Sequence, residues 1–277
     1  QNGIKLKAGD DYTATTGTTV VLVQGASAND VVEMVAFDVF SVGDTVSAKD
    51  GGSFGGTVGF GAGIASPITI NGATPTLTIG DAGAEDAKIV FDGNAQDFHI
   101  GLDDSIDSLT IGKGSTLGTT TSMVIDANGI ITKPLQPAFS VNKSGTQQAN
   151  FAINTAVTAT FDAERFDNNA DFDLTNNRFV APVTGKYFLT ATLRLGAVDT
   201  AAGFYVTKIN TSNQIYSTII DPNFTADLDY MSQTVTIVAD MDANDTSHIS
   251  VVQNAGTAQA DINGEVEYAY FSGYLLG

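Results

Sequence analysis

Residues 186–195 read Lys-Tyr-Phe-Leu-Thr-Ala-Thr-Leu-Arg-Leu, a run in which every second side chain is apolar. Successive side chains of a β-strand point to opposite faces of the sheet. One face therefore carries Tyr187, Leu189, Ala191, Leu193 and Leu195, and the other carries Lys186, Phe188, Thr190, Thr192 and Arg194. This pattern predicts an antiparallel strand with one face in a core and the other toward solvent.

The rest of the chain has the same β character. Short runs rich in Val, Ile, Thr, Phe and Tyr alternate with Gly, Asn, Asp and Ser clusters about every 8 to 12 residues, and no stretch reads as a long amphipathic helix. Pro134 and Pro137 mark a boundary, after which strands are expected at 234–241, 248–253 and 266–276. We predict an all-β protein whose residues 134–277 form a jelly-roll sandwich.

Composition excludes several classes of protein. The 277 residues include 31 acidic and 12 basic side chains, giving a net charge of -19 that would repel nucleic acid and an anionic membrane surface. No apolar run approaches the roughly 18 residues that a membrane helix needs, so no membrane insertion is expected. With no cysteine and two histidines, thiolate chemistry, disulfides and the usual zinc sites are excluded.

Residues 1–48 predict a small β module of about four strands. It opens with a tight turn at Asn2-Gly3, and strands are expected at 4–7, 10–13, 18–23 and 31–40. The module resembles one that recurs in phage tail-fibre proteins, where a further strand precedes the Asn-Gly turn. Since that strand is missing here and the chain begins at Gln1, we expect a processed chain or a piece of a longer protein.

Residues 49–133 form a Gly- and Asp-rich repetitive segment, and residues 50–56 read as a flexible junction. The sequence Leu77-Thr78-Ile79-Gly80 returns as Leu109-Thr110-Ile111-Gly112, with the related Phe98-His99-Ile100-Gly101 between them. Each copy offers too little apolar surface for an independent core, which favours a shaft intertwined with identical copies in a trimer. A sheet extension of a monomer is the alternative. Residues 90–105 and 124–129 resemble a shaft segment and its closing hairpin in tail-fibre and other virion structural proteins.

The C-terminal segment carries the most specific resemblance. Its central motif runs Asn177-Arg178-Phe179-Val180-Ala181-Pro182-Val183-Thr184-Gly185-Lys186-Tyr187-Phe188, with Pro137–Val141 before it and Phe271–Leu276 at the end. Phe161-Asp162, Phe166-Asp167 and Phe172-Asp173 also match. These residues resemble the globular head of the complement first-component recognition protein, a trimeric jelly roll shared with tumour-necrosis-factor-like proteins. The collagen stalk of the animal proteins is missing.

Together the resemblances imply the distal part of a bacteriophage tail fibre or a similar virion appendage, extracellular when mature. They imply a homotrimer that contacts other tail or capsid proteins and binds a host-surface glycan or protein, and they assign no receptor-binding residue. Alternatives are a head fibre or decoration protein without receptor duty, a secreted bacterial adhesin, and a depolymerase.

An enzyme would have to use carboxylates, of which Asp103-Asp104 and Asp227 with Asp229 are the clearest pairs. A glycosidase needs two carboxyl groups at a set distance across a cleft, and adjacent acids in turns give no sign of that geometry. Sugar-binding platforms also favour Trp, which is absent. We expect no enzymatic activity and no catalytic residue.

Two clusters of oxygen ligands are candidates for structural calcium; otherwise no cofactor is expected. One consists of Asp240, Asp242, Asn244 and Asp245, and the other of Asp167, Asp171 and Asp173. The first lacks the Gly and Glu of an EF-hand, since Asp245 and Val251 occupy those positions. The alternative is that both are solvated loops whose side chains accept hydrogen bonds from turn backbone.

Two further groups of residues are expected to be structural. His99 and His248 lie far apart in the sequence, without an evident nucleophile beside either. Tyr268, Tyr270 and Tyr274 share one face of the last strand, and tyrosine suits protein interfaces. Core or trimer packing is favoured for these tyrosines over a receptor patch.

Overall fold

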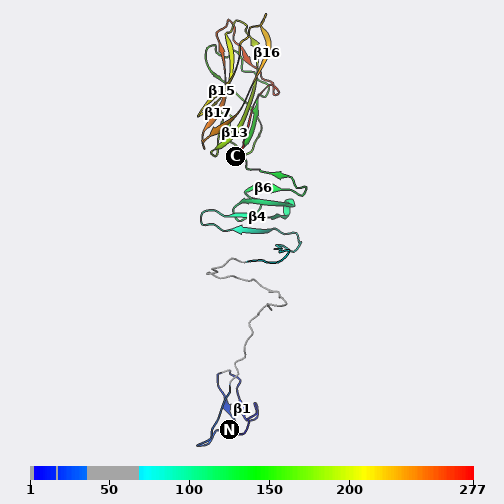
Figure 1. Ribbon diagram of the computed structural model, residues 1–277, viewed down its shortest axis with the longest axis vertical. Coiled ribbons are helices and arrows are strands. Elements are labelled where there is room, and N and C mark those ends of the chain that lie inside the picture. The colour runs from blue at the N-terminus through cyan, green and yellow to red at the C-terminus, as the bar shows by residue number, and fades with distance from the viewer. Residues whose placement is uncertain (1–2, 17, 36–68) are drawn as a thin grey trace. The chain divides into compact units, whose positions relative to one another are not determined.

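The computed structural model describes residues 3–16, 18–35 and 69–277 (Figure 1). The chain forms two compact units, Gln1–Gly72 and Ala73–Gly277. The prediction of an all-β fold is confirmed, since the described residues contain one helical element, the short 3-10 helix η1 (Asp104–Ile106). No helix in the described ranges is long and apolar enough to cross a membrane.

The N-terminal unit contains one small hairpin among its described residues. Strand β1 (Tyr12–Thr13) pairs antiparallel with β2 (Val21–Leu22). The strands expected at 4–7 and 31–35 are not formed, and the one expected at 18–23 is shortened to β2. Ile4 and Val31 are each 72% exposed, so burial does not stabilise an extended strand at either place. Residues 36–40 of the last expected strand, and the junction at 50–56, lie outside the described residues.

The second unit begins with a five-stranded antiparallel sheet in the order β3-β4-β5-β6-β7 (Figure 1). The strands are β3 (Ala87–Phe91), β4 (Phe98–Asp103), β5 (Ser108–Lys113), β6 (Thr121–Ile125) and β7 (Ile131–Thr132). Two of the three sequence repeats lie on the neighbouring strands β4 and β5. The first copy of the repeat, residues 77–80, forms no strand; Leu77 and Ile79 are exposed, and β3 instead pairs with β4.

The hairpin expected at 124–129 is present and closes this sheet. One carboxylate oxygen of Asp126 accepts hydrogen bonds from the backbone N–H groups of Asn128 (2.9 Å) and Ile130 (2.8 Å). Gly129 has a φ of 78°, a left-handed conformation that glycine adopts without steric cost. The turn thus joins β6 to β7.

The remaining strands form two packed sheets. The first has the order β10-β8-β19-β13-β16, with β18 beside β13, and the second has the order β11-β12-β17-β14-β15, with β9 beside β17. The first comprises β8 (Ala138–Asn142), β10 (Ala163–Asp167), β13 (Gly185–Val198), β16 (Leu228–Met241), β18 (Asp261–Ile262) and β19 (Ala269–Leu275). The second comprises β9 (Val157–Thr158), β11 (Phe172–Asp173), β12 (Arg178–Val180), β14 (Phe204–Thr211), β15 (Ile215–Ile220) and β17 (Thr246–Asn254).

The core of this jelly roll lies between the two sheets, as the alternation in residues 186–195 predicts. Tyr187, Leu189, Ala191, Leu193 and Leu195 are all fully buried. At one end of the core the rings of Phe139 and Phe179 stack with centroids 4.6 Å apart, and Phe271 packs edge-on at 4.9 Å from Phe139. The motif around residues 177–188 therefore supplies both strand alternation and aromatic packing.

The predicted last strand, residues 266–276, is too long at its start. The backbone N–H of Tyr268 donates to the carbonyl of Glu265 over 3.1 Å, so residues 265–268 form a turn. Strand β19 consequently begins at Ala269. Its pairing with β13 and β8 places it in the middle of the first sheet.

Candidate functional site

The first jelly-roll sheet has a face that points away from the core, here called the outer face. Register places its side chains in three rows across β19, β13 and β16. The rows are Tyr274, Phe188 and Val238; Ser272, Thr190 and Thr236; and Tyr270, Thr192 and Thr234. The rings of Phe188 and Tyr274 lie 5.2 Å apart, yet Tyr274 is 45% exposed and Val238 is 54% exposed. The outer face therefore exposes aromatic and apolar surface.

Six serine and threonine hydroxyl groups of the outer face form cross-strand pairs. The Oγ atoms of Thr190 and Thr236 lie 2.8 Å apart, and those of Thr192 and Thr234 lie 2.9 Å apart. On the neighbouring strands the hydroxyls of Ser140 and Ser272 are also 2.8 Å apart. A buried hydroxyl costs free energy only when it lacks a hydrogen bond. These cross-strand pairs lower the cost of covering the face with another protein surface.

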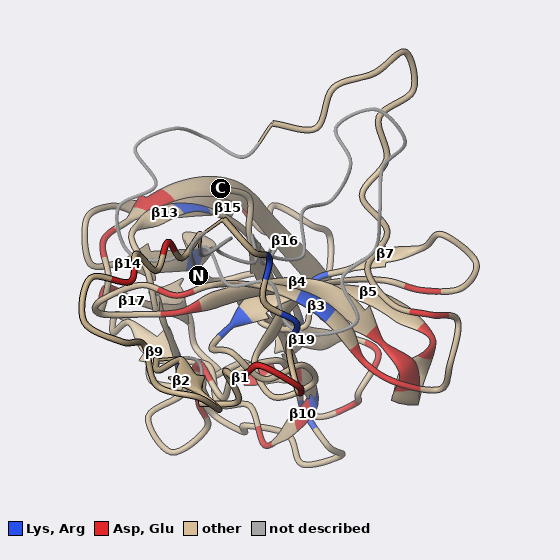
Figure 2. Ribbon diagram, turned by 90° about the horizontal axis from the view of Figure 1, so that it is seen from below, with Lys and Arg blue, Asp and Glu red and all other residues tan. Residues whose placement is uncertain are grey.

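Charge is concentrated outside these rows. In the chain as a whole acidic residues outnumber basic ones 31 to 12, and Figure 2 shows the red acidic residues spread over the described part of the chain. Among the described residues of β8, β19, β13 and β16, however, none of the three rows contains Asp or Glu. Lys186 and Asp240 pair in register beyond the Phe188 row. The three rows thus form an uncharged strip on an acidic protein.

Arg194 closes the other end of the strip. Its guanidinium carbon lies 3.6 Å from the ring centroid of Tyr268 and 4.2 Å from that of Tyr230, a cation–π arrangement on both sides. Its Nη2 atom lies 3.2 Å from a carboxylate oxygen of Glu265. Tyr270 and Tyr274 belong to β19, and Tyr268 precedes it, so the tyrosine cluster predicted from sequence borders and lines the outer face.

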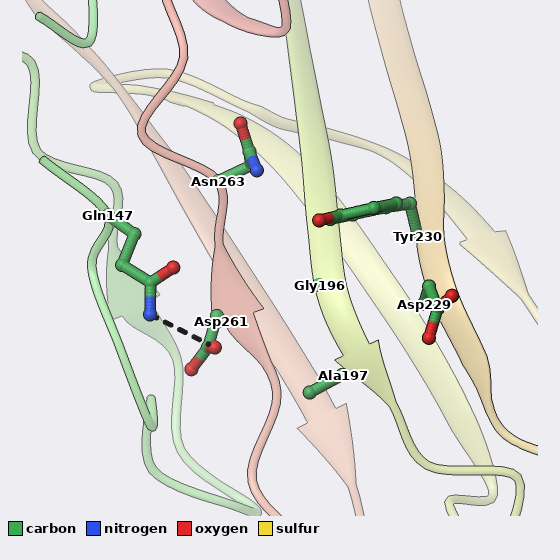
Figure 3. A pocket seen from close by; sticks show the side chains of 7 residues that line it. All are labelled: Gln147, Gly196, Ala197, Asp229, Tyr230, Asp261 and Asn263. Carbon is green, nitrogen blue, oxygen red and sulfur yellow. Dashed lines mark hydrogen bonds between the residues drawn. The ribbon is translucent and has the colours of Figure 1, made fainter. Parts of the chain in front are cut away.

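A polar pocket of about 260 Å³ lies beyond Arg194 (Figure 3). Its lining consists of Gln147, Gly196, Ala197, Asp229, Tyr230, Asp261 and Asn263. Asp261 is held by two donors: the backbone N–H of Asn150 at 2.6 Å and the side-chain amide of Gln147 at 3.3 Å. Figure 3 shows the ring of Tyr230 extending over β13 at Gly196. The pocket offers carboxylate, amide and phenol groups to a ligand rich in hydroxyl or amine groups.

Sequence reasoning found only part of this pocket. It singled out Asp229 but missed Gln147 and Asp261, which are far from it in the sequence. The pairing of Gly196 with both Tyr230 and Asp261 brings these segments together. No local sequence motif indicates that these residues lie close together, since their proximity depends on which strands pair.

The first calcium candidate lies in the turn between β16 and β17. One carboxylate oxygen of Asp245 accepts hydrogen bonds from the N–H of Asp242 (2.9 Å) and the amide of Asn213 (2.8 Å). Asn244 adopts a φ of 73° in the same turn, and Asp240 lies near the end of β16 on the outer face. The Asp245 side chain thus organises the turn backbone.

The second candidate follows β10. The two carboxylate oxygens of Asp167 accept the N–H groups of Asp171 (3.0 Å) and Phe172 (2.8 Å). Burial raises the pKa of Asp171, whereas hydrogen bonds from Asn176 lower the pKa of Asp173. Within the described residues, no group of three or more acidic or histidine side chains is placed to hold a metal ion. Calcium binding at either cluster stays a prediction, which melting curves with calcium and with a chelator test.

His99 and two of the remaining acids, Asp103 and Asp227, have local structural partners. His99 is buried, and its Nδ1 hydrogen-bonds to the carbonyl of Gly114 at 2.9 Å. His248 lies in β17, where burial lowers its pKa. Asp103 accepts the hydroxyl of Ser105, and Asp227 accepts the N–H and hydroxyl of Thr200. The structure brings neither the histidines nor these acids together.

Comparison with known proteins identifies the family to which the second half of the chain is similar. Similar solved structures include the globular domain of zebrafish complement 1qA protein (19% identity, TM-score 0.38), where the match covers 98% of that chain and 51% of this one. Murine APRIL (10% identity, TM-score 0.38) and Eiger TNF from S. frugiperda (11% identity, TM-score 0.38) are covered to 99% and 93%, again by 51% of this chain. No curated protein matches the chain. The C1q domain family model matches residues 138–276, half of the sequence, and the chain therefore belongs to the C1q domain family.

Proposed function

We propose that the chain forms a homotrimeric binding head in which the three uncharged rows on the outer face of the first jelly-roll sheet are the contact between subunits. C1q and tumour-necrosis-factor-like domains typically form trimeric heads in binding or structural proteins. The observation that carries the proposal is the uncharged strip formed by the three rows around Phe188, Thr190 and Thr192. Copies with a net charge of -19 repel one another least where their facing surfaces lack acidic groups.

Oligomeric mass tests the subunit contact. We expect light scattering on the full chain to give a trimer, and Thr192→Glu to raise its dissociation constant about 100-fold or more, because each contact then buries an unpaired carboxylate. Ser217→Glu is the control, since Ser217 is exposed on β15 in the other sheet. A wild-type monomer, or equal loss of mass in both variants, would contradict the proposal.

The trimer's role, in our proposal, is recognition of a host-surface glycan or protein by a phage tail fibre or similar virion appendage. Residues 90–105 and 124–129 support the virion setting through their resemblance to a shaft segment and its closing hairpin. The pocket supports ligand binding, because Asp229, Asp261 and Gln147 offer the acceptors and donors that a hydroxyl-rich glycan requires. C1q-type domains are generally ligand-binding or structural modules rather than enzymes. A virion component without receptor duty, or a secreted adhesin, is the alternative to this role.

Binding to host cells tests the role separately from assembly. We expect labelled full-length trimer to bind candidate host bacteria saturably and to block phage adsorption. Asp261→Ala should weaken binding at least tenfold without changing the trimer mass, whereas Asp221→Ala, an exposed acid outside the pocket, should not. A verified trimer that binds no host cell would favour the structural alternative.

A further inference from the structure

The sheet formed by β3 to β7 has two chemically different faces. On one face, called the covered face, β4 places His99, Gly101 and Asp103, and β5 places Ser108, Thr110 and Gly112. The opposite face, called the apolar face, carries Ala87, Ile89, Phe91, Phe98, Ile100, Leu102, Leu109, Ile111, Met123, Ile125 and Ile131. Small and polar residues thus alternate with large apolar ones along the strands.

The covered face is closed by the chain's own loop between β5 and β6, residues 114–120. The carbonyl of Gly114 pairs with His99, and the carbonyl of Ser115 accepts the amine of Lys88 at 2.7 Å. Leu117, in the middle of the loop, is only 7% exposed. A Cβ atom at Gly112 would lie 2.7 Å from the His99 ring and from the carbonyl of Thr120. The small residues of this face therefore make room for the loop.

The apolar face has no such cover from the described residues. Its side chains remain exposed at Phe91 (60%), Ile131 (58%), Phe98 (51%), Leu102 (46%), Ile89 (40%), Leu109 (39%) and Ile111 (37%). They are contiguous, since register places one row at Ile89, Ile100, Ile111 and Met123, and another at Leu102, Leu109, Ile125 and Ile131. An apolar patch across five strands exceeds the scattered exposed residues normal for a monomer and marks an interaction surface.

Charge narrows the choice of partner. None of the residues of the apolar face is acidic, although the chain carries 31 acidic residues. Among the described residues of these strands, Lys113 is the charged side chain on this side, at the edge beside Phe98. A basic partner would be attracted by carboxylates on the surface that it covers, and this face has none. An acidic partner, such as a second copy of this chain, is repelled least by a surface without carboxylates, and this face is such a surface.

We propose that the apolar face is covered by the same face of other copies of this chain, so that the sheets of a trimer enclose a shared core. This inference rests on the proposed homotrimeric head. Residues 133–137 connect β7 directly to β8 of the head. Three assembled heads would therefore hold three such sheets at an effective concentration of about millimolar, which favours their association. The apolar area of each sheet then becomes buried between subunits instead of facing water.

Single cysteines in the full chain test the proposal, because the natural sequence contains none. Ile111→Cys, and Leu109→Cys as a second site, place a thiol on the apolar face. Val90→Cys is the matched control, since Val90 is 36% exposed on β3 but pairs with His99 and so faces the other way. We expect a short bis-maleimide to cross-link copies carrying Cys at 111 or 109. Maleimide labelling at these sites should be at least tenfold slower than at position 90.

The outcomes separate this proposal from that of the head trimer. A trimer whose thiols at 111 and 109 label rapidly and do not cross-link would overturn the shared core and leave the head trimer standing. Protection in a monomeric sample would assign the cover to another segment of the same chain, which also overturns it. Cross-linking can also be measured in Thr192→Glu, in which the heads are separated. If it persists there, it would support the shared core independently of the contact between heads. Rapid labelling of a monomer would contradict both proposals.

Discussion

At the scale of single residues, Asp199 shows how one buried carboxylate joins distant turns of the head. It is 3% exposed and directly follows β13. Its carboxylate accepts hydrogen bonds from the backbone N–H groups of Ala201 (2.7 Å), Ala258 (2.8 Å) and Thr257. These N–H groups, that of Ala258 foremost, lower the pKa of Asp199. The turn after β13 is thereby fixed to the segment after β17.

The lowered pKa of Asp199 determines how its contribution to the stability of the fold changes with pH. A carboxyl group whose pKa is lower in the folded than in the unfolded state stabilises the fold fully above its unfolded pKa of about 3.9. That contribution disappears as the pH falls through the folded-state pKa. Acid therefore weakens the link between the two turns.

Asp199→Asn should destabilise the head by about 1–3 kcal/mol at pH 7, because an amide replaces one acceptor with a donor that faces other donors. The variant should also lose less stability than the wild type when the pH is lowered below about 4. Urea denaturation at several pH values measures both effects. Asp221→Asn, at an exposed site, is the control. An unchanged free energy of unfolding at pH 7 in Asp199→Asn would contradict this account.

At the scale of elements, alternation predicted the strands with one continuous apolar face and failed elsewhere. Residues 186–195 anticipated most of β13, whose alternation reports its buried face directly. The start of β16 was missed because Gln233 occupies a core position, where it accepts the hydroxyl of Thr207 (2.7 Å) and donates to the carbonyl of Tyr205 (3.2 Å). A buried polar residue whose hydrogen bonds are made interrupts the apolar alternation from which a strand is predicted. The pocket escaped prediction for a related reason, since strand pairing and not sequence spacing assembles it.

Gly112→Ala tests whether the loop at 114–120 covers its sheet as the contacts indicate. The added methyl group would meet the His99 ring at 2.7 Å, so we expect a loss of about 1–3 kcal/mol through overpacking. Hydrogen exchange measured by mass spectrometry should become faster in residues 98–120 and stay unchanged in β13. Gly72→Ala is the control, because nothing lies within 4 Å of its added Cβ. Unchanged exchange in residues 98–120 would show that the loop does not pack on the sheet.

At the scale of the whole molecule, the association of copies is opposed by electrostatic repulsion between their negative charges. Each chain carries a charge of -19, while the outer face of the head and the apolar face of the β3–β7 sheet both lack acidic residues in the rows described above. The attraction between copies would then come from apolar burial, which salt does not screen. The repulsion would come from carboxylates outside the contacts, which salt does screen.

Salt should therefore strengthen the trimer. The screening length falls from about 10 Å at 0.1 M to about 3 Å at 1 M salt, which removes most of the repulsion between exposed carboxylates of neighbouring copies. We expect sedimentation analysis to give a dissociation constant at least tenfold lower in 1 M than in 0.1 M sodium chloride. Thr192→Glu should depend on salt more steeply, because it adds like charges at the contact itself. A dissociation constant that rises with salt would instead mean that ion pairs, such as one between Lys186 and Asp240 of neighbouring copies, hold the subunits together.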